Sequence, residues 1–429
     1  MDLDRLLTTP LDPALKGLPG LPAAAGLTLN DIAKARWSLL RGELPFPVAT
    51  IDGTALAANS RWMRDFTRAH GLFLCPHGKT TMAPQLFRRQ LEDGAWGITV
   101  ATVQQLRVCR IFGVKRLLMA NQLLAPADLR EVFEAIRADA ALDFYCLVDS
   151  AENADQLSDA ARRFDAGRPL QVLLEAGVPG GRTGCRSREG AFELAAMIDA
   201  RRPYLALRGI EGFEGVMEAG DEGAVRDYVA GVCALAGDCR RRGLFGGGRP
   251  ILSLGGSIFF DIVATHPGVR AAREHFDVIL RSGCYLTHDS RMLAGNFERM
   301  RARSPGIDAA GGPRPALTVW GLIQSLPEPG LAILDVGKRD VSYDVDLPVA
   351  ERWYRQGLHT MPVGLPEPAK ATQINDQHLF LAVSSPTQYR VGDVIGLGIS
   401  HPCTTFDKWR LLYVLDDQFE ATEGILTFF

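Results

Sequence analysis

The sequence predicts an α/β protein in which a (β/α)8 TIM-type barrel is followed by a C-terminal all-β domain. From residue 72 onward, short apolar runs alternate with amphipathic helical stretches, which is typical of parallel strands joined by crossover helices. Near residue 310 the helical stretches end, and strand-like runs separated by Gly, Pro and Asp follow. The 429 residues also exceed the usual size of one domain, so two domains are expected.

Eight apolar runs form the predicted barrel strands, which are 72–75, 97–100, 116–120, 143–148, 170–175, 205–209, 251–254 and 278–281. The helical stretches between them are 84–91, 103–112, 127–137, 154–163, 191–198 and 225–239. Eight parallel strands can close into a barrel in which the eighth strand pairs with the first. An open doubly wound sheet shows the same alternation and is the alternative at this level.

Changes in composition set the predicted domain boundaries. Residues 1–45 are rich in Pro and Leu and form an N-terminal extension, 46–310 form the barrel, and 311–429 form the β domain. The remaining predicted elements are the strand 47–51, the helix 54–70, the linker 311–315 and the β-domain strands 316–324, 331–336, 378–383, 393–396 and 411–415.

The composition argues against several classes of partner. The formal charge is −3 and there is no long basic run, which disfavours nucleic acid. No apolar segment is long enough to cross a membrane, and the start MDLDRLLTTP lacks the basic and apolar regions of a signal peptide. Eight scattered cysteines without a CxxC pair fit a reducing compartment. We therefore expect a cytoplasmic protein.

The stretch LFLCPHGKTTMAP, residues 72–84, carries the first candidate for catalysis. Lys79 follows the first barrel strand, so in a barrel it lies at the mouth, where the active sites of this fold are found. A low-dielectric surrounding would lower the pKa of this lysine and allow it to form an imine with an aldehyde. The alternative is a solvated loop lysine. His77 either tunes a cofactor ring or is a packed turn histidine.

Glycine loops follow the last two predicted strands. Strand seven ends in Gly255-Gly256-Ser257, and strand eight ends in Gly283-Cys284-Tyr285. The loops after strands seven and eight of such barrels often bind phosphate, because glycine allows close approach and exposed N–H groups bind anions. Each loop alone is also explained by a tight turn. Together with an imine-forming lysine, they indicate pyridoxal 5′-phosphate, a phosphorylated aldehyde, as cofactor.

Arg182 lies in a glycine-rich loop after strand five, within residues 175–184. At the barrel mouth its permanently charged guanidinium would face the pyridine nitrogen and keep it unprotonated. The alternative is an ion pair with a nearby carboxylate such as that of Glu175.

The β domain contains a candidate metal site, His401-Pro402-Cys403. In an extended segment residues two apart point to the same side, so the His401 imidazole and the Cys403 thiolate can share one metal ion. A nitrogen and a sulfur ligand favour zinc or another late first-row ion. A metal with so few protein ligands keeps positions open for a substrate, as a Lewis acid requires. The alternative is a chance His-x-Cys pair.

These motifs together resemble the D-serine dehydratase and D-threonine aldolase family. The resemblance rests on PHGKT with the following Thr-x-x-Pro, on GAWGITVAT, on the two glycine loops and on the late His-x-Cys, and it covers about residues 45–415. It implies an alanine-racemase-like, fold type III pyridoxal-phosphate enzyme that is a homodimer. In this family Lys79 would be the imine-forming lysine and Arg182 would face the pyridine nitrogen. The phosphate cradle would be Gly255, Gly256, Ser257, Gly283, Cys284 and Tyr285, and the metal ligands His401 and Cys403.

The resemblance also implies an activity. The D-threonine aldolase branch tends to have a carboxylate where this chain has Cys403, which favours the dehydratase branch. We therefore expect a lyase that converts a D-serine-like D-3-hydroxyamino acid into a 2-oxo acid and ammonia, with pyridoxal phosphate and a divalent metal. The alternatives are a D-threonine-type aldolase, a racemase or a non-catalytic cofactor carrier. Relatives offer Tyr or His where this chain has Val216, so the substrate's β-substituent stays open.

Overall fold

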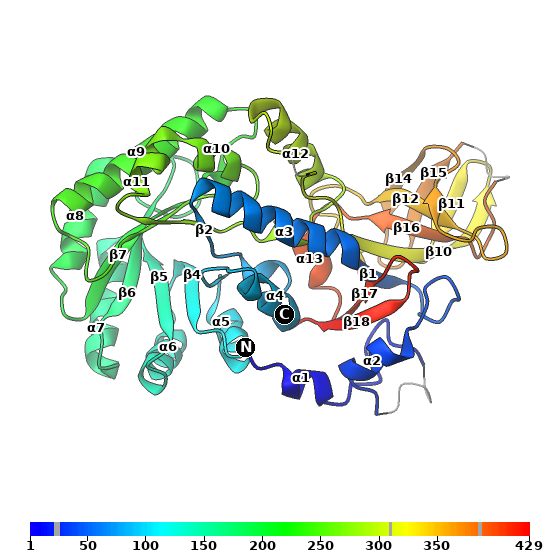
Figure 1. The fold of residues 1–429 in the computed structure, drawn as a ribbon, viewed down its shortest axis with the longest axis horizontal. Helices are drawn as coiled ribbons and strands as arrows, with labels where there is room; N and C mark the ends of the chain where they lie inside the picture. The colour runs from blue at the N-terminus through cyan, green and yellow to red at the C-terminus, as the bar shows by residue number, and fades with distance from the viewer. Residues whose placement is uncertain (21–25, 309–310, 385–387) are drawn as a thin grey trace. The chain divides into compact units, whose positions relative to one another are not determined.

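The computed structural model describes residues 1–20, 26–308, 311–384 and 388–429 (Figure 1). The chain divides into two compact units. The barrel unit comprises residues 64–79 and 89–283 together with Met1, and the β unit comprises residues 2–63, 80–88 and 284–429. The predicted boundary between residues 310 and 311 adjoins 309–310, which lie outside the described residues.

The barrel unit contains one parallel sheet of eight strands in the order β2-β9-β8-β7-β6-β5-β4-β3. The strands are β2 (Phe73–Leu74), β3 (Ile98–Val100), β4 (Arg116–Gln122), β5 (Asp143–Val148), β6 (Leu170–Ala176), β7 (Leu205–Gly212), β8 (Ile251–Ser253) and β9 (Asp277–Leu280). All eight predicted runs are confirmed, and the eighth strand pairs with the first, Phe73 opposite Ile279.

Backbone bonds connect the two ends of this sheet. The N–H of Trp96 donates to the carbonyl of Leu74 at 2.7 Å, and that of Thr99 to Pro76 at 2.9 Å. These bonds join the β2 segment to β3, so the barrel closes and the open-sheet alternative is wrong. Seven buried side chains contributed by six of the strands or their ends fill the interior, namely Cys75, Leu118, Tyr145, Leu147, Leu173, Ile251 and Ile279.

Helices follow the strands as the alternation predicts, and Figure 1 shows α6 and α7 beside β5 and β6. Several begin where a Ser, Thr or Asp accepts the N–H of the residue three positions on, as Thr102 does for Gln105 and Ser150 for Asn153. The barrel-unit helices are α5 (Val103–Ile111), α6 (Pro126–Ala138), α7 (Ala151–Phe164), α8 (Arg188–Asp199), α9 (Glu222–Arg241), α10 (Phe260–Thr265) and α11 (Pro267–Ala272).

The β unit is built on a ten-stranded, mainly antiparallel sheet. Its strands are β1 (Val48–Asp52), β10 (Leu317–Glu328), β11 (Leu331–Leu334), β12 (Val349–Tyr354), β13 (Val363–Gly364), β14 (Ala369–Ile374), β15 (Leu379–Val383), β16 (Val394–Gly398), β17 (Leu411–Leu415) and β18 (Ala421–Leu426). The predicted all-β architecture is confirmed. The early strand β1 lies within this sheet, antiparallel to β10 and parallel to β17.

The N-terminal residues also pack in the β unit. Leu29 and Ile32 of α2 (Leu29–Ala35) are buried, and an added Cβ at Gly424 of β18 would lie 2.5 Å from Ile32. The Tyr413 hydroxyl donates to the carbonyl of Gly17 at 2.8 Å. Residues of the N-terminal segment therefore pack against β17 and β18 of this sheet. The remaining helices are α1 (Asp4–Thr8), α3 (Gly53–His70), α4 (Pro84–Glu92), α12 (Met292–Arg303) and α13 (Pro402–Phe406), with 3-10 turns η1 (Gly78–Thr80), η2 (Glu214–Val216) and η3 (Cys284–Leu286).

Across the described ranges, none of the helices combines the length and apolarity needed to span a bilayer. All eight cysteines are free thiols.

Candidate active site

Lys79 follows the carboxyl end of β2, in the 3-10 turn η1. The N–H of His77, two residues earlier, donates to the carbonyl of Arg281 at 3.2 Å, which fixes this turn against the end of β9. The expectation of a low-dielectric surrounding for Lys79 is wrong, because the residue is exposed. In the described part of the chain no carboxylate pairs with its amine, so the amine is free to meet a ligand.

His77 is the buried polar group beside this lysine. Its Nδ1 is buried and has no hydrogen-bond partner. Burial lowers the pKa of His77 well below its usual value, and the charges of Lys79, Arg281 and Arg182 lower it further. The imidazole is therefore neutral. The charges of Lys79, Arg182 and Arg281 thus all act on the same imidazole.

Arg182 lies in the loop between β6 and α8, and its guanidinium carbon is 4.8 Å from the centre of the Phe213 ring. The alternative of an ion pair with Glu175 is wrong. The Glu175 carboxylate instead accepts hydrogen bonds from Gln122 at 2.5 Å and from Thr183 at 2.7 Å. Arg182 is therefore left as an exposed cation at the carboxyl end of β6.

Arg281 at the end of β9 is the third of these cations, and sequence reasoning did not assign it to the site. Its buried side chain forms an ion pair with Glu211 of β7 and donates to the carbonyl of Gly212 at 3.1 Å. Burial raises the pKa of Glu211 to about 7, with further contributions from Glu175 and Glu214, although Arg281 opposes this shift. The sequence signal that could have identified Arg281 is its position two residues before Gly283, where the second glycine loop begins.

The first glycine loop is already bonded within the protein. The N–H groups of Gly255 and Gly256 donate to the buried carboxylate of Glu214, at 3.1 and 2.7 Å. An added Cβ at Gly256 would lie 2.6 Å from the Phe213 ring, so packing alone requires glycine there. These two amides are therefore not free donors for a phosphate. The neighbouring Ser257 is half-buried and has no such carboxylate bond.

The second glycine loop is divided between the units, with Gly283 in the barrel unit and η3 in the β unit. Cys284 and Tyr285 are buried. The two glycine loops are joined inside the barrel unit, where the Ser282 hydroxyl donates to the carbonyl of Gly256 at 2.7 Å.

The His401 and Cys403 pair lies at the start of a helix. His401 is the residue before α13, and Cys403 is in the first turn after Pro402. The expectation of an extended segment is wrong here, because proline favours the first turn of a helix. The two side chains still meet, since a hydrogen bond between them is the largest cause that raises the pKa of His401, to about 9.

Asp344 and Cys284 complete this cluster within the β unit. The Asp344 carboxylate lies 2.7 Å from Nδ1 of His401 and accepts a hydrogen bond from Thr404. The Cys284 and Cys403 sulfurs are 3.5 Å apart, and the Thr80 hydroxyl lies 3.5 Å from Cys403.

The protonation of the cluster follows from these contacts. Bonds from Cys284, His401 and Thr80 lower the pKa of the Cys403 thiol well below its usual value, against the opposing effect of burial. Burial would raise the pKa of Asp344, but the bonds with Thr404 and His401 hold it below its usual value. Among the described residues, no group of three or more His, Cys, Asp or Glu is placed to hold a metal ion.

His401 and Cys403 are the two residues of this cluster whose donor atoms could hold a metal ion. A carboxylate on Nδ1 of a histidine orients the ring and directs Nε2 to a metal, as in many zinc sites. Sequence reasoning missed Asp344, which is 57 residues before His401 and has no motif to mark it.

Two protein families match this chain. Residues 51–257 match the alanine racemase N-terminal domain, and residues 316–415 match the putative serine dehydratase domain. The fold and these matches define an alanine-racemase-like protein, with a parallel barrel and an antiparallel C-terminal domain.

Curated relatives and solved structures agree with this class. The chain is 27% identical to a D-threonine aldolase of Arthrobacter sp over 91% of its length and 94% of that protein. It is 25% identical to a 3-hydroxy-D-aspartate aldolase of Paracoccus denitrificans (strain Pd 1222), over 71% of its length and 75% of that protein.

The solved structures include a D-threonine aldolase from Filomicrobium marinum, with a TM-score of 0.73, 20% identity and coverage of 91% and 96%. They also include a cysteine-to-alanine variant of D-threo-3-hydroxyaspartate dehydratase in the metal-free form, with a TM-score of 0.70, 21% identity and coverage of 91% and 99%. The chain thus matches both domain models and is similar to D-threonine and 3-hydroxy-D-aspartate aldolases, in agreement with the resemblance that its motifs indicate.

Proposed function

We propose that the protein is a pyridoxal-phosphate- and metal-dependent lyase that converts a D-serine-like D-3-hydroxyamino acid into a 2-oxo acid and ammonia. The arrangement of Asp344, His401 and Cys403 is the observation that carries this proposal. An imidazole oriented by a carboxylate, together with a thiolate, suits zinc. Two protein ligands leave coordination positions open for a substrate hydroxyl.

The cofactor would be held by residues of the barrel mouth. The exposed amine of Lys79 would bond the aldehyde, and the Arg182 guanidinium would face the ring nitrogen. The unpartnered Nδ1 of His77 supports this assignment, because a buried polar atom without a partner requires a group to satisfy it. When bound, pyridoxal phosphate supplies an electron sink that makes the α-hydrogen of the substrate acidic.

For the phosphate we propose a cradle of Ser257, Gly283, Cys284 and Tyr285. Gly255 and Gly256 are left out of this cradle, because their N–H groups are bonded to Glu214. A phosphate placed on those two amides would also have to approach a buried carboxylate. The first glycine loop thus supports the cradle by its packing against Phe213 and not by its amides.

Different residues of this chain would serve proton transfer and the departure of the leaving group. The Lys79 amine would accept the α-proton, for which it has no competing carboxylate partner in the described chain. Asp344 would hold the His401 ring with Nε2 toward the metal. A Lewis acid bound by His401 and Cys403 would stabilise the departing β-hydroxide. Lys79 and Thr80 are consecutive in the sequence, and Thr80 contacts Cys403.

The similar proteins support the substrate class. Their names specify D-threonine, 3-hydroxy-D-aspartate and D-threo-3-hydroxyaspartate, all of which are D-amino acids with a hydroxyl on the β-carbon. One structure of the D-threo-3-hydroxyaspartate dehydratase is a cysteine-to-alanine variant in a metal-free form, and the ligand proposed at Cys403 is of the same residue type.

An assay of D-serine, D-threonine and D-3-hydroxyaspartate, with and without a chelator, tests the proposal. We expect 2-oxobutanoate and ammonia from D-threonine, inactivity after chelation and recovery with zinc. The L-enantiomers serve as controls and should not react. Failure of all three D-amino acids to release ammonia would refute the proposed activity.

An aldolase is the second candidate, because the curated relatives of 25% and 27% identity are aldolases. The same residues would then support cleavage between Cα and Cβ. Acetaldehyde and glycine from D-threonine would identify this activity. Racemisation that survives the chelator would instead favour a racemase, in which the metal has no role.

We also propose that the enzyme is a homodimer, as the family resemblance implies. Light scattering after size exclusion should give twice the mass of one chain. A mass of one chain at micromolar concentration would contradict this part of the proposal.

A further inference from the structure

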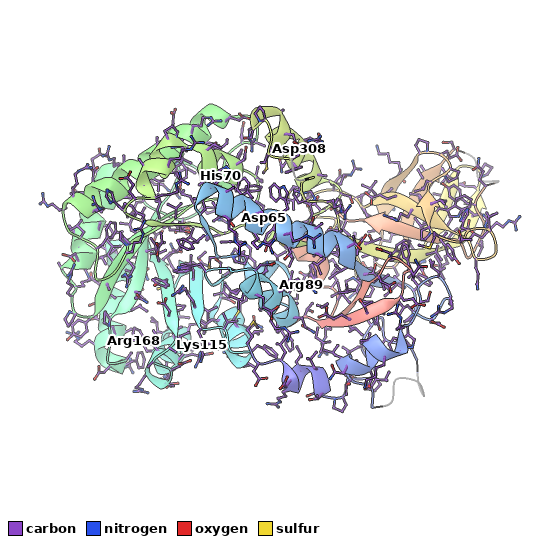
Figure 2. The ribbon with its side chains drawn as sticks, viewed as in Figure 1. Asp65, His70, Arg89, Lys115, Arg168 and Asp308 are labelled. Carbon is purple, nitrogen blue, oxygen red and sulfur yellow. The ribbon has the colours of Figure 1, made fainter. Side chains whose placement is uncertain are left out.

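A pocket lies in the barrel unit at the amino ends of the strands, away from the residues discussed above. It has a volume of about 330 Å³ and is bordered by the starts of β5, β6 and β7 and by the Gly246-Gly247 turn before β8. Lys115 and Arg168, which precede β4 and β6, lie on the same side of the barrel unit (Figure 2). Lys79 and Arg182 follow the carboxyl ends of strands, so this pocket is at the opposite end of the barrel.

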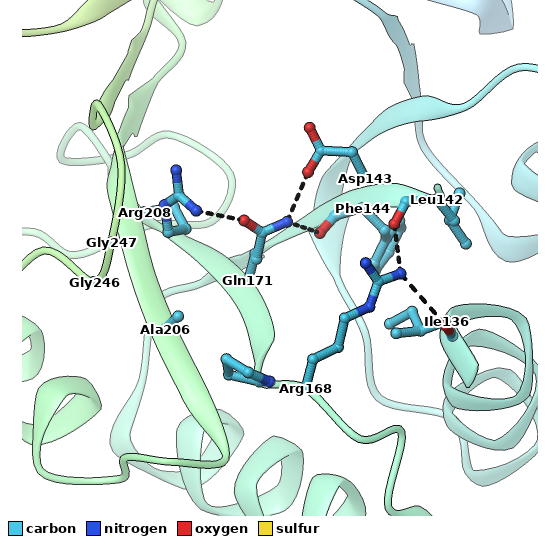
Figure 3. Close-up of a pocket in the computed structure, with 11 residues that line it drawn as sticks. Ile136, Leu142, Asp143, Phe144, Arg168, Gln171, Ala206, Arg208, Gly246 and Gly247 are labelled. Atoms are coloured by element: carbon cyan, nitrogen blue, oxygen red, sulfur yellow. Dashed lines mark hydrogen bonds between the residues drawn. The ribbon is translucent and has the colours of Figure 1, made fainter. Parts of the chain in front are cut away.

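Arg208 is the cation of this pocket, and the backbone directs it there. Residues 172 and 173 of β6 pair with 207 and 209 of β7, so Arg208 is the extra residue of a β-bulge. Bulges re-aim a side chain at the cost of regular pairing, and they recur beside binding sites. Figure 3 shows the Arg208 guanidinium bonded to Gln171, which in turn bonds Asp143.

One edge of the Arg208 guanidinium has no partner. Nη1 donates to Gln171 at 2.6 Å, whereas Nε is buried and has no acceptor. No ion pair of Arg208 occurs in the part of the chain that the structure describes. A buried N–H without an acceptor is destabilising, and in native proteins it is usually satisfied by water or a ligand.

Two other arginines show what this edge binds. Nε and Nη2 of Arg107 grip both oxygens of Glu131, at 2.8 and 2.6 Å, and those of Arg355 grip Asp393 at 2.6 and 2.7 Å. Each is a side-on pairing of a planar guanidinium with a planar carboxylate. Arg208 presents the same edge without a carboxylate.

The polar groups of the neighbouring residues already have partners within the protein. Asp143 accepts from Arg116 at 2.7 Å and from Gln171 at 2.8 Å. Arg168 donates to four backbone carbonyls, including that of Leu142 at 2.7 Å, and serves to hold the chain (Figure 3). Arg168 keeps its positive charge but its terminal nitrogens donate within the protein, whereas Arg208 has a donor without an acceptor.

We propose that this pocket binds a small organic carboxylate, held side-on by Nε and Nη2 of Arg208. The volume lies at the lower end of the range of small-molecule sites, which is about 300–1,000 Å³. The glycine turn leaves space at the pocket rim, because an added Cβ at Gly247 would meet no atom within 4 Å.

Calorimetric titration of the full-length protein with malonate tests this proposal, with malonamide as the neutral analogue at equal ionic strength. Gly247 supplies matched variants, since its backbone accepts a side chain without a clash. We expect Gly247→Asn to bind malonate as the wild type does. Gly247→Asp, which adds only a negative charge, should bind at least about 10-fold more weakly.

Arg208→Gln should abolish the binding heat, and Arg240→Gln, an exposed arginine of α9, should leave it unchanged. If Arg208→Gln does not fold, the two Gly247 variants decide the question. Equal malonate affinity in both Gly247 variants, or binding of malonamide as tightly as malonate, would overturn the site. Tighter binding of inorganic phosphate than of malonate would overturn the carboxylate class.

Discussion

Burial disfavours charge on His77 and Glu211 of the barrel unit, whereas hydrogen bonds promote charge in the cluster of the β unit. In the barrel unit, desolvation lowers the pKa of His77 and raises that of Glu211 to about 7, so both favour the neutral form. In the β unit, mutual hydrogen bonds raise the pKa of His401 to about 9 and lower those of Cys403 and Asp344.

The difference matches the two kinds of ligand proposed. A neutral imidazole beside an exposed lysine suits an aromatic ring and an amine-reactive aldehyde. The Cys403 thiolate suits a cation, and a metal bound there would have to displace the proton of His401, because metal ligands must be deprotonated. Each prediction below alters one of these two clusters, from the largest expected effect to the smallest.

Replacing Lys79 by Ala should have the largest effect. Loss of the group that bonds the cofactor and moves the α-proton should lower kcat by about a thousand-fold or more. Borohydride treatment followed by mass spectrometry should find a pyridoxyl group on Lys79 in the wild type and none in the variant. Lys115→Ala, which removes an exposed lysine paired with Asp139, is the matched control. A pyridoxyl label at another lysine of the wild type would disprove the assignment.

The buried carboxyl of Glu211 should make folding stability depend on pH. Its pKa of about 7 in the folded protein exceeds the ordinary value of 4.5, so the folded state retains a proton that the unfolded state has lost. The free energy of unfolding should therefore fall by up to about 3 kcal/mol as the pH rises from about 4.5 to about 7. Urea unfolding should show a shallower fall for Glu211→Gln. Glu193→Gln, at an exposed site on α8, should follow the wild type; an identical profile for all three proteins would contradict the assignment.

Removing the charge of Asp344 should weaken metal binding without removing a ligand. Loss of a carboxylate behind a metal-bound histidine typically costs about 10- to 100-fold in affinity. Competition with a chromogenic chelator should show this loss in Asp344→Asn. Asp346→Asn, two residues further on and exposed, should keep the wild-type affinity. Equal affinities in both variants would show that Asp344 does not support a metal ligand.

The smallest expected effect is the oxidation of two thiols of the β-unit cluster, Cys284 and Cys403, to a disulfide. The Cys284 and Cys403 sulfurs are 3.5 Å apart, and a disulfide requires about 2.05 Å. One molecule of hydrogen peroxide should oxidise the two thiols to a disulfide and form two molecules of water. The mass of the protein should fall by about 2 Da. Peptide mapping should find Cys284 linked to Cys403 in metal-free protein, with zinc slowing the reaction. Cys185, which has no thiol neighbour in the described structure, is the internal reference. Oxidation of Cys403 to a disulfide with another cysteine, at the same rate in the Cys284→Ser variant, would refute the pairing.

Local patterns in the sequence were sufficient for the elements and for part of the site. The eight apolar runs correspond to the eight strands because parallel strands covered by helices are apolar along their length. Lys79 and Arg182 could be named because functional residues of such barrels follow strand ends.

The tertiary structure decided what depends on contacts between distant residues. The Glu214 carboxylate accepts hydrogen bonds from the amides of Gly255 and Gly256. No local pattern shows that a carboxylate about 41 residues away is their acceptor. The ion pair of Arg281 with Glu211 requires β7 and β9 to face the same interior.

The sequence by itself determined the order of elements, the barrel class and the residue types at the strand ends, because these depend on local spacing and burial. Only the folded chain decided which neighbours those residues meet and therefore their charge. Asp344 behind His401, and the unpaired edge of Arg208 at a β-bulge, are products of long-range packing. A side chain's protonation and its free hydrogen-bonding edge depend on what surrounds it in space, and sequence spacing does not specify these surroundings.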